Sequence, residues 1–183
     1  MQVTKLKTKS MKIYQIENFL SGEECRQLIE LVNISNDRVQ NNNFSRETIY
    51  LPNNLEIIRE LDIRIHQSLN IPENRGDDIQ FQFYNQGGYL NKHYDFFRTD
   101  NDYDIKQIQS NGQRKWTFLI YLNDVESGGE TYFVHENIKI KPKVGRAIYW
   151  TNTKKGLPNF DSLHEGCQVI SGNKYIVTKG IRN

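Results

Sequence analysis

From residue 78 onward, apolar residues recur at every second position, and this period limits the possible folds more than any other feature of the chain. In DIQFQFYN (78–85), Ile79, Phe81 and Phe83 alternate with two glutamines and a tyrosine. KWTFLIYLND (115–124) shows the same period, and short segments punctuated by Gly and Pro follow to residue 181. Residues i and i+2 of an extended chain project from one face, so each segment is predicted to be a strand. Many short strands indicate a sandwich or jelly roll.

Two helices are predicted before these strands. In SGEECRQLIELVN (21–33), Ser21 and Glu24 have the spacing of a capping box, and apolar residues follow at helical spacing. A second amphipathic pattern covers 55–70, with His66 expected on the helix surface. The polar stretch between them, 39–54, is expected to be a connection. Because helices precede strands without alternating with them, the class is mainly β with N-terminal helices (α+β), and not a doubly wound α/β fold.

Length and composition fit one domain. The chain has 183 residues, so residues 13–183 are expected to form a single domain after a flexible tail over 1–12. A net charge of +2 gives no sign of a nucleic-acid partner. We find no apolar run of about 20 residues for a membrane span and no secretory signal. Since Cys25 and Cys167 are the only cysteines, an intracellular, reducing location is expected.

Candidate metal ligands lie within the strand pattern. His93 and Asp95, in GGYLNKHYDFF (87–97), are two positions apart and would project together from an extended chain. A third ligand could come from His135, in FVHEN, or from His164, in SLHEGCQVI. Spacing alone does not choose between them, and His135 is equally typical of a hairpin turn. Two histidines and one carboxylate form the facial triad of non-heme iron(II) oxygenases.

Lys174 adds a second clue. In NKYIVTKGI (173–181), Lys174 shares a face with Ile176 and Thr178, and one face of a jelly-roll strand looks into the barrel. An inward ammonium needs an anionic partner, because an unpaired buried charge costs several kcal/mol. The distal carboxylate of 2-oxoglutarate would supply that anion. The alternative places Lys174 on the outer face of the barrel.

Four ordered segments resemble one family. FYNQGGYLNKHYDFF, RKWTFLIYLNDVESGGETYF, IKPKVGRAIYW and SLHEGCQVISGNKYIVTKGIR are similar to successive signature blocks of the prolyl 4-hydroxylase branch of the Fe(II)/2-oxoglutarate-dependent dioxygenases. The helix segment IENFLSGEECRQLIE also resembles that family, so the likeness covers about residues 13–182. It implies a double-stranded β-helix (jelly roll) with supporting helices.

The resemblance assigns roles by motif position. It implies His93, Asp95 and His164 as iron ligands, and Lys174 as the partner of the 2-oxoglutarate C5 carboxylate. Tyr84, Thr117 and Tyr121 are implied contacts of the cosubstrate; the alternative for these three is core packing. His135 then becomes a hairpin residue. Gly180, Trp150 and Arg98 are expected on the substrate side.

One position departs from the family pattern. Many relatives carry tryptophan where this chain has Gly180, and the missing indole is expected to widen the entrance for substrate. A second open point is RTDNDYDIKQIQSNGQR (98–114), a polar segment directly after the His-x-Asp strand. Long loops in compact domains are often lids or disordered. Both interpretations of 98–114 stay open.

The function implied is hydroxylation of a peptidyl proline, similar to procollagen-proline 4-dioxygenase. The implied cosubstrates are 2-oxoglutarate and O2, with ascorbate as reductant and succinate and CO2 as products. One alternative keeps the chemistry and changes the target to a lysyl residue or a small molecule. Another is a non-catalytic jelly-roll binding module. The sequence does not indicate the oligomeric state.

Overall fold

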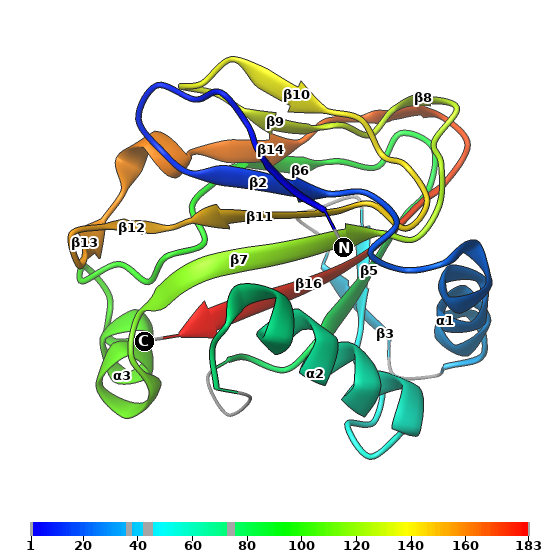
Figure 1. Cartoon of the computed structure of the whole chain (residues 1–183), viewed down its shortest axis with the longest axis horizontal. Helices are drawn as coiled ribbons and strands as arrows, with labels where there is room; N and C mark the ends of the chain where they lie inside the picture. The colour runs from blue at the N-terminus through cyan, green and yellow to red at the C-terminus, as the bar shows by residue number, and fades with distance from the viewer. Residues whose placement is uncertain (1, 36–37, 42–45, 73–75, 183) are drawn as a thin grey trace.

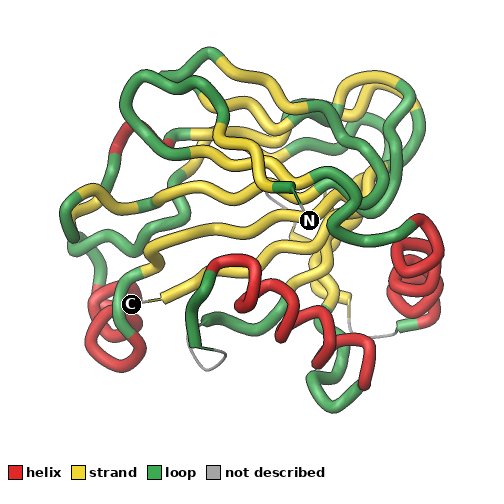
Figure 2. The backbone as a smooth tube through the Cα atoms, viewed as in Figure 1, coloured by secondary structure: helices red, strands yellow, loops and turns green. Residues whose placement is uncertain are grey.

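Two β-sheets face each other in the computed structural model, which describes residues 2–35, 38–41, 46–72 and 76–182 (Figure 1). The larger sheet has the strand order β1-β2-β11-β7-β16-β5-β4-β3, and the smaller has the order β10-β9-β14-β6. Every pairing within them is antiparallel. Strands dominate the centre and helices lie outside it (Figure 2). The predicted jelly roll with supporting helices is confirmed.

The strands of the larger sheet are β1 (Val3–Lys5), β2 (Ile13–Ile16), β3 (Arg38–Asn41), β4 (Arg46–Ile49), β5 (Gln80–Tyr84), β7 (Arg114–Tyr121), β11 (Ala147–Thr151) and β16 (Lys174–Arg182). Those of the smaller sheet are β6 (Leu90–His93), β9 (Thr131–Phe133), β10 (Ile138–Ile140) and β14 (His164–Gly166). Two short pairs join β12 (Thr153–Lys154) to β13 (Leu157–Pro158) and β15 (Val169–Ser171) to β8 (Ser127–Gly128). The helices are α1 (Gly22–Ile34), α2 (Glu56–Leu69), α3 (Asp102–Asn111) and the 3-10 turn η1 (Phe160–Ser162).

The alternation in β7 divides the core into two layers. Phe118 and Ile120 pack with the apolar stripes of α1 and α2 on the outer face of the larger sheet. Leu119 and Tyr121 face the smaller sheet and pack with Ile176 of β16. The strands are therefore buried on both faces, and the polar residues on their inner face end up inside the molecule.

Both predicted helices form at the expected places. Ser21 caps α1, and the capping box with Glu24 is complete. α2 ends at Leu69, where Asn70 adopts a left-handed conformation with φ of 53°. His66, however, is fully buried and not on the surface, and its Nε2 lies 3.6 Å from Asp62 Oδ1. Helical spacing alone does not show that this edge of α2 is also buried.

The N-terminal segment and the stretch 39–54 differ from expectation. Residues 1–12 were predicted to be a flexible tail, but β1 pairs with β2, and Met11 is buried. The Glu136 carboxylate also accepts hydrogen bonds from the backbone N–H groups of Ser10 and Met11. Within 39–54, the structure has part of β3 and the whole of β4, which extend the larger sheet beyond β5. The two strands lack the alternation that predicts a strand from sequence.

The segment 98–114 is not a structureless loop. α3 begins after Asn101, whose side chain accepts a hydrogen bond from the Asp104 backbone N–H, and ends before Gly112. No residue of α3 is buried, which explains why the segment shows no apolar period. His135 is exposed in the hairpin between β9 and β10, as the resemblance implied. Among the described helices, none is long and apolar enough to cross a membrane.

Removal of the α1 cap tests the helix assignment. Ser21→Ala deletes the hydroxyl that accepts from the Glu24 backbone N–H. We expect the free energy of unfolding to fall by about 1 kcal/mol, measured by urea denaturation. Ser127→Ala is the control, because Ser127 is exposed and its hydroxyl has no hydrogen-bond partner among the described residues. Equal stability of the two variants would contradict the role of the cap.

Candidate metal and cosubstrate site

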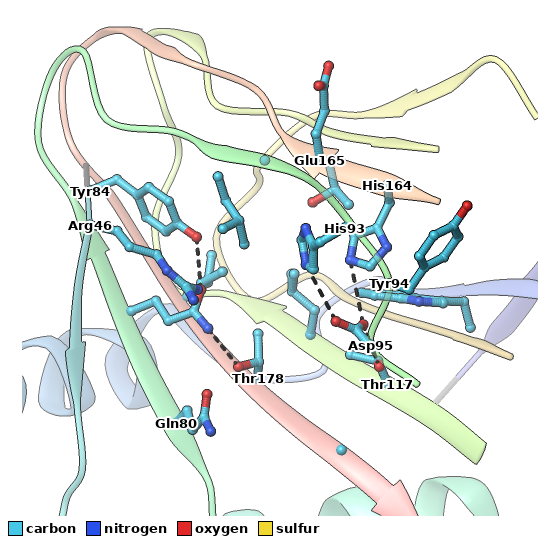
Figure 3. Close-up of a pocket in the computed structure, with 18 of the residues that line it drawn as sticks. Arg46, Gln80, Tyr84, His93, Tyr94, Asp95, Thr117, His164, Glu165 and Thr178 are labelled. Atoms are coloured by element: carbon cyan, nitrogen blue, oxygen red, sulfur yellow. Dashed lines mark hydrogen bonds and ion pairs between the residues drawn. The ribbon is translucent and has the colours of Figure 1, made fainter. Parts of the chain in front are cut away.

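A cavity of about 240 Å³ lies between the two sheets (Figure 3). The inner faces of β5, β7 and β16 form one wall, and β6 and β14 form the opposite wall. Its lining includes Arg46, Asp77, Gln80, Gln82, Tyr84, Leu90, His93, Tyr94, Asp95, Arg114, Thr117, Leu119, Thr131, Trp150, His164, Glu165, Gly166, Lys174, Ile176, Thr178 and Gly180. Most of the polar groups inside the barrel therefore gather in one place.

Strand register brings the candidate ligands together. His93 of β6 pairs directly with His164 of β14, and their ring centroids are 4.2 Å apart. Asp95 follows β6 and places Oδ1 3.4 Å from His93 Nε2 and Oδ2 3.5 Å from His164 Nε2. One ligand atom from each residue lies within 4.8 Å of the others. Of the two histidines considered for the third ligand, His164 lies in this cluster, whereas His135 is exposed elsewhere.

Backbone carbonyls fix the orientation of both rings. His93 Nδ1 is 2.7 Å from the Asn91 carbonyl oxygen, and His164 Nδ1 is 2.9 Å from the Ser162 carbonyl oxygen. A carbonyl oxygen only accepts hydrogen bonds, so each Nδ1 carries the proton, and each Nε2 presents a lone pair to the cluster. Two neutral imidazoles and one carboxylate are a donor set that suits iron(II).

The Asp95 carboxylate is stabilised in its charged form. Burial alone would raise its pKa, but the neighbouring His164 and His93 rings and a hydrogen bond from Thr117 hold the pKa far below its usual range. The Thr117 hydroxyl donates to Asp95 Oδ2 at 2.7 Å and accepts from Asn152 Nδ2 at 2.8 Å. Burial lowers the pKa of His164 to about 4, which keeps its ring neutral at physiological pH. These protonation states are the ones that bind metal ions.

Lys174 brings a positive charge into the same cavity. Its side chain is 1% exposed, and its Nζ lies 4.9 Å from the centroid of the Tyr84 ring. Within the described residues, Nζ has no hydrogen bond or ion pair. Burial lowers the pKa of Lys174 to about 8, as expected for an ammonium without an anionic partner. The inward orientation predicted for Lys174 is confirmed.

Comparisons with known proteins decide the family. Residues 79–182 match the model of the 2OG-Fe(II) oxygenase superfamily. The chain belongs to this superfamily. Probable prolyl 4-hydroxylase 10 of Arabidopsis thaliana is 32% identical over 90% of this chain and 66% of its own length. Prolyl 4-hydroxylase subunit alpha-1 of Homo sapiens is 30% identical over 67% of this chain but only 23% of its own length.

A solved structure supports the same assignment. The 2OG complex of the viral collagen prolyl hydroxylase from Paramecium Bursaria Chlorella virus-1 is 28% identical, with a TM-score of 0.76, and the match covers 93% of this chain and 94% of that one. The resemblance to the prolyl 4-hydroxylase branch is therefore confirmed, and iron(II) and 2-oxoglutarate are the cofactor and cosubstrate of the superfamily. His93, Asp95 and His164 have the donor set to hold the iron.

The residues predicted to contact the cosubstrate do not all line the cavity. Tyr84 and Lys174 line the cavity, and the Tyr84 hydroxyl donates to Gln82 Oε1 at 2.8 Å. Thr117 also lines it, but its hydroxyl donates to Asp95, one of the candidate metal ligands. Tyr121 is not part of the lining, because its hydroxyl donates to Thr131 Oγ1 at 2.6 Å inside the core.

The three substrate-side residues also differ in position. Trp150 lines the cavity and packs edge-on against His164, with centroids 4.9 Å apart. Arg98 does not line the cavity: it is exposed and pairs with Asp100. Gly180 lines the cavity, but the space beside it is not open. A Cβ at this position would collide with the Asp77 carboxylate and lie 2.8 Å from Arg114 Nε. The expected widening of the entrance is therefore offset by these charged groups.

Sequence reasoning missed several polar residues of this oxygenase cavity. Arg46 lies in the stretch expected to be a connection, and Figure 3 shows its side chain beside Tyr84. Arg114 begins β7 and donates to the Asp95 backbone carbonyl at 3.4 Å. Gln80 and Gln82 share a strand face with Tyr84, so the alternation in β5 already contained the signal for these two.

The hydrogen bond between Thr117 and Asp95 gives a test of the metal site. Thr117→Val keeps the side-chain shape and removes the hydroxyl that donates to the carboxylate. We expect affinity for iron(II) or manganese(II) to fall about 10- to 100-fold, measured by isothermal titration calorimetry without oxygen. Thr178→Val is the matched control, because the Thr178 hydroxyl accepts from Gln82 and contacts no metal ligand. Unchanged metal affinity in Thr117→Val would show that Asp95 needs no such support.

Proposed function

We propose that this protein hydroxylates a prolyl residue in a peptide or protein, in an iron(II)- and 2-oxoglutarate-dependent reaction that yields succinate and CO2. The observation that carries the proposal is one cavity that contains a His-Asp-His triad and the buried ammonium of Lys174, which has no anionic partner among the described residues. The likeness to prolyl 4-hydroxylases over most of the chain supports proline as the target. The chain spans 66% of the length of the Arabidopsis relative.

The protein's own residues bind and orient the reactants. His93, Asp95 and His164 would hold the iron on one side, which leaves positions for a bidentate ligand and for dioxygen. Iron(II), when bound with 2-oxoglutarate and O2, supplies the oxidising chemistry that places one oxygen atom on a substrate C–H bond. Lys174 would pair with the distal carboxylate of 2-oxoglutarate, and Tyr84 lies near enough to Lys174 to contact the same group.

Two alternatives remain distinct from this proposal. A lysyl residue or a small molecule as target would keep the triad and Lys174 unchanged, so only substrate screening separates these cases. A non-catalytic module with a structural metal would favour four protein ligands. Among the described residues the cluster has three, which supports a catalytic site.

Substrate screening tests the proposal directly. The protein is incubated with iron(II), ascorbate, 2-oxoglutarate and libraries of proline- or lysine-containing peptides. We expect succinate release and the mass gain of one oxygen atom on proline. Oxygen on lysine alone would overturn the proline assignment, and a protein that binds iron without any succinate release would support the non-catalytic module.

The intracellular location expected from the sequence belongs to the same proposal. Both cysteines are free thiols, which fits a reducing location.

Loss of the buried ammonium should weaken cosubstrate binding. Lys174→Met removes the charge and keeps an unbranched side chain in the cavity. We expect the KM for 2-oxoglutarate to rise by roughly two to three and a half decades, because one unpaired carboxylate in a buried ion pair costs roughly 3–5 kcal/mol. Lys92→Met is the control, because Lys92 lies exposed on β6. A normal KM in Lys174→Met would assign the carboxylate to another cation in the lining, such as Arg46.

Binding of 2-oxoglutarate should weaken as the pH rises. The Lys174 ammonium is present below its pKa of about 8 and is lost as the pH rises through that value. Affinity for 2-oxoglutarate should therefore be highest below about pH 8 and fall by up to about tenfold per pH unit above it. Measurement of KM from about pH 6.5 to 9.5 checks this. Lys174→Arg, which stays protonated throughout, should lack the decrease, and a decrease of equal size in this variant would point to a different group.

A further inference from the structure

The segment that contains Asp95 lies outside the sheets. β6 ends at His93, and the next strand along the chain, β7, begins only at Arg114. The pairing of His93 with His164 fixes the position of His93, but Asp95 lies in a bend after β6, so no strand pairing fixes its backbone. A metal ligand has to be held to within about 0.5 Å of its working position. The position of Asp95 must therefore come from contacts that strand pairing does not supply.

The side chain of Gln113 makes such a contact. Gln113 lies directly before β7 and is buried. Its Oε1 accepts a hydrogen bond from the Phe97 backbone N–H at 2.7 Å, and its Nε2 donates to the Phe97 backbone carbonyl at 2.8 Å. The same Oε1 accepts from the Arg114 backbone N–H at 2.9 Å. The amide thus pairs with Phe97 as a neighbouring strand would. We call the two hydrogen bonds to Phe97 the Gln113 clamp.

The ring of Phe97 is held at the same place as its backbone. Phe97 is buried, and the guanidinium carbons of Arg114 and Arg182 lie 4.4 Å and 4.6 Å from the centroid of its ring. These distances are typical of cation–π contacts. Arg114 Nη1 also donates to the Asp95 backbone carbonyl at 3.4 Å. Phe97 is therefore fixed by both its backbone and its side chain, two residues after Asp95.

The clamp closes a long excursion of the chain. Between Phe97 and Gln113 the chain forms α3, and no residue of α3 is buried. The two ends of such an excursion separate freely unless a contact joins them, because closing a loop costs conformational entropy. The Gln113 clamp joins the two ends. Movement of α3 is thereby kept from reaching the segment that contains Asp95.

We propose that Gln113 is a positioning residue for the metal site. It holds the backbone that follows Asp95, so that the carboxylate stays within 3.5 Å of His93 Nε2 and His164 Nε2. Thr117, which Figure 3 shows beside Asp95, holds the carboxylate itself. The two contacts thus act on different parts of one residue. This inference rests on the proposed role of Asp95 and the two histidines as metal ligands.

A purely structural role for Gln113 makes a different prediction. An unpaired backbone N–H in a buried position costs about 1–3 kcal/mol, so loss of the amide should lower the stability of the fold in either case. A change in stability alone therefore does not separate the two roles. Metal affinity separates them, because only a positioning residue affects the ligand geometry of a protein that stays folded.

Gln113→Met tests the positioning role, because it keeps an unbranched side chain and removes both hydrogen bonds of the clamp. We expect the affinity for manganese(II) to fall roughly tenfold, measured by isothermal titration calorimetry without oxygen. The visible absorption bands of bound cobalt(II), which report the coordination geometry, should also shift. Normal manganese(II) affinity in folded Gln113→Met would overturn the proposal.

Asn123→Leu is the matched control. Asn123 follows the opposite end of β7, and its amide also contacts the backbone on both sides. Its Nδ2 donates to the Asn173 carbonyl and its Oδ1 accepts from the Tyr175 N–H, each at 2.8 Å. None of its hydrogen-bond partners among the described residues is a candidate ligand. Asn123→Leu should therefore leave manganese(II) affinity unchanged, and a loss equal to that of Gln113→Met would assign both effects to general destabilisation.

Hydrogen exchange of the metal-free protein, followed by NMR, tests the clamp itself. The Phe97 amide should exchange faster in Gln113→Met than in the unmodified protein, and at the unmodified rate in Asn123→Leu. Unchanged exchange in Gln113→Met would show that Gln113 does not hold this backbone. If Gln113→Met does not fold, Gln113→Asn takes its place, because its amide is one methylene too short to reach both groups of Phe97. The same loss of metal affinity is expected from it.

Two further variants separate the possible failures. If Gln113 and Thr117 both act through Asp95, the loss of manganese(II) affinity in Gln113→Met/Thr117→Val should be smaller than the product of the two separate losses. A full product would mean that Gln113 acts by another route and would overturn its role. Asp95→Ala tests the ligand assignment: normal manganese(II) affinity in this variant would refute both proposals. Loss of affinity in Asp95→Ala but not in Gln113→Met would refute the positioning role alone.

Discussion

The buried Asp95 carboxylate is the group on which the rest of the site depends. It lies within 3.5 Å of both candidate ligand histidines and accepts a hydrogen bond from Thr117. A buried carboxylate without partners would be protonated, and a protonated Asp95 could not hold a divalent ion. Strands from both sheets therefore have to meet around this one charge, β6 and β14 from the smaller sheet and β7 from the larger.

Much of the fold and of the site could be predicted from the sequence, because both follow from the two-residue period. The alternation in β16 grouped Lys174 with Ile176 and Thr178, and the structure shows that this face looks into the cavity. The same period put His93 and Asp95 together. The choice of His164 over His135 needed the resemblance to the family, since spacing contains no information about which hairpin meets which strand.

The parts that could not be predicted have physical causes. α3 buries no residue, so no periodic pattern marks it in the sequence. Arg46 reaches the cavity from a strand that shows no alternation, and His66 is buried although it lies beside the apolar stripe of α2 and not within it. Tyr121 projects from the same strand face as Thr117, but its hydroxyl donates a hydrogen bond to Thr131 within the core. The two-residue period of a strand thus indicates toward which face of the sheet a side chain projects. Its hydrogen-bond partners depend on residues that are distant in the chain.

The direct pairing of His93 with His164 has a consequence for how this protein can vary. A shift of one residue in the register of β6 against β14 would turn one imidazole to the opposite face of the sheet. Insertions or deletions within these two short strands would therefore abolish function even where the barrel still folds. The hairpin at His135 and the turn before β6 have no such restriction, so natural length variation should accumulate there.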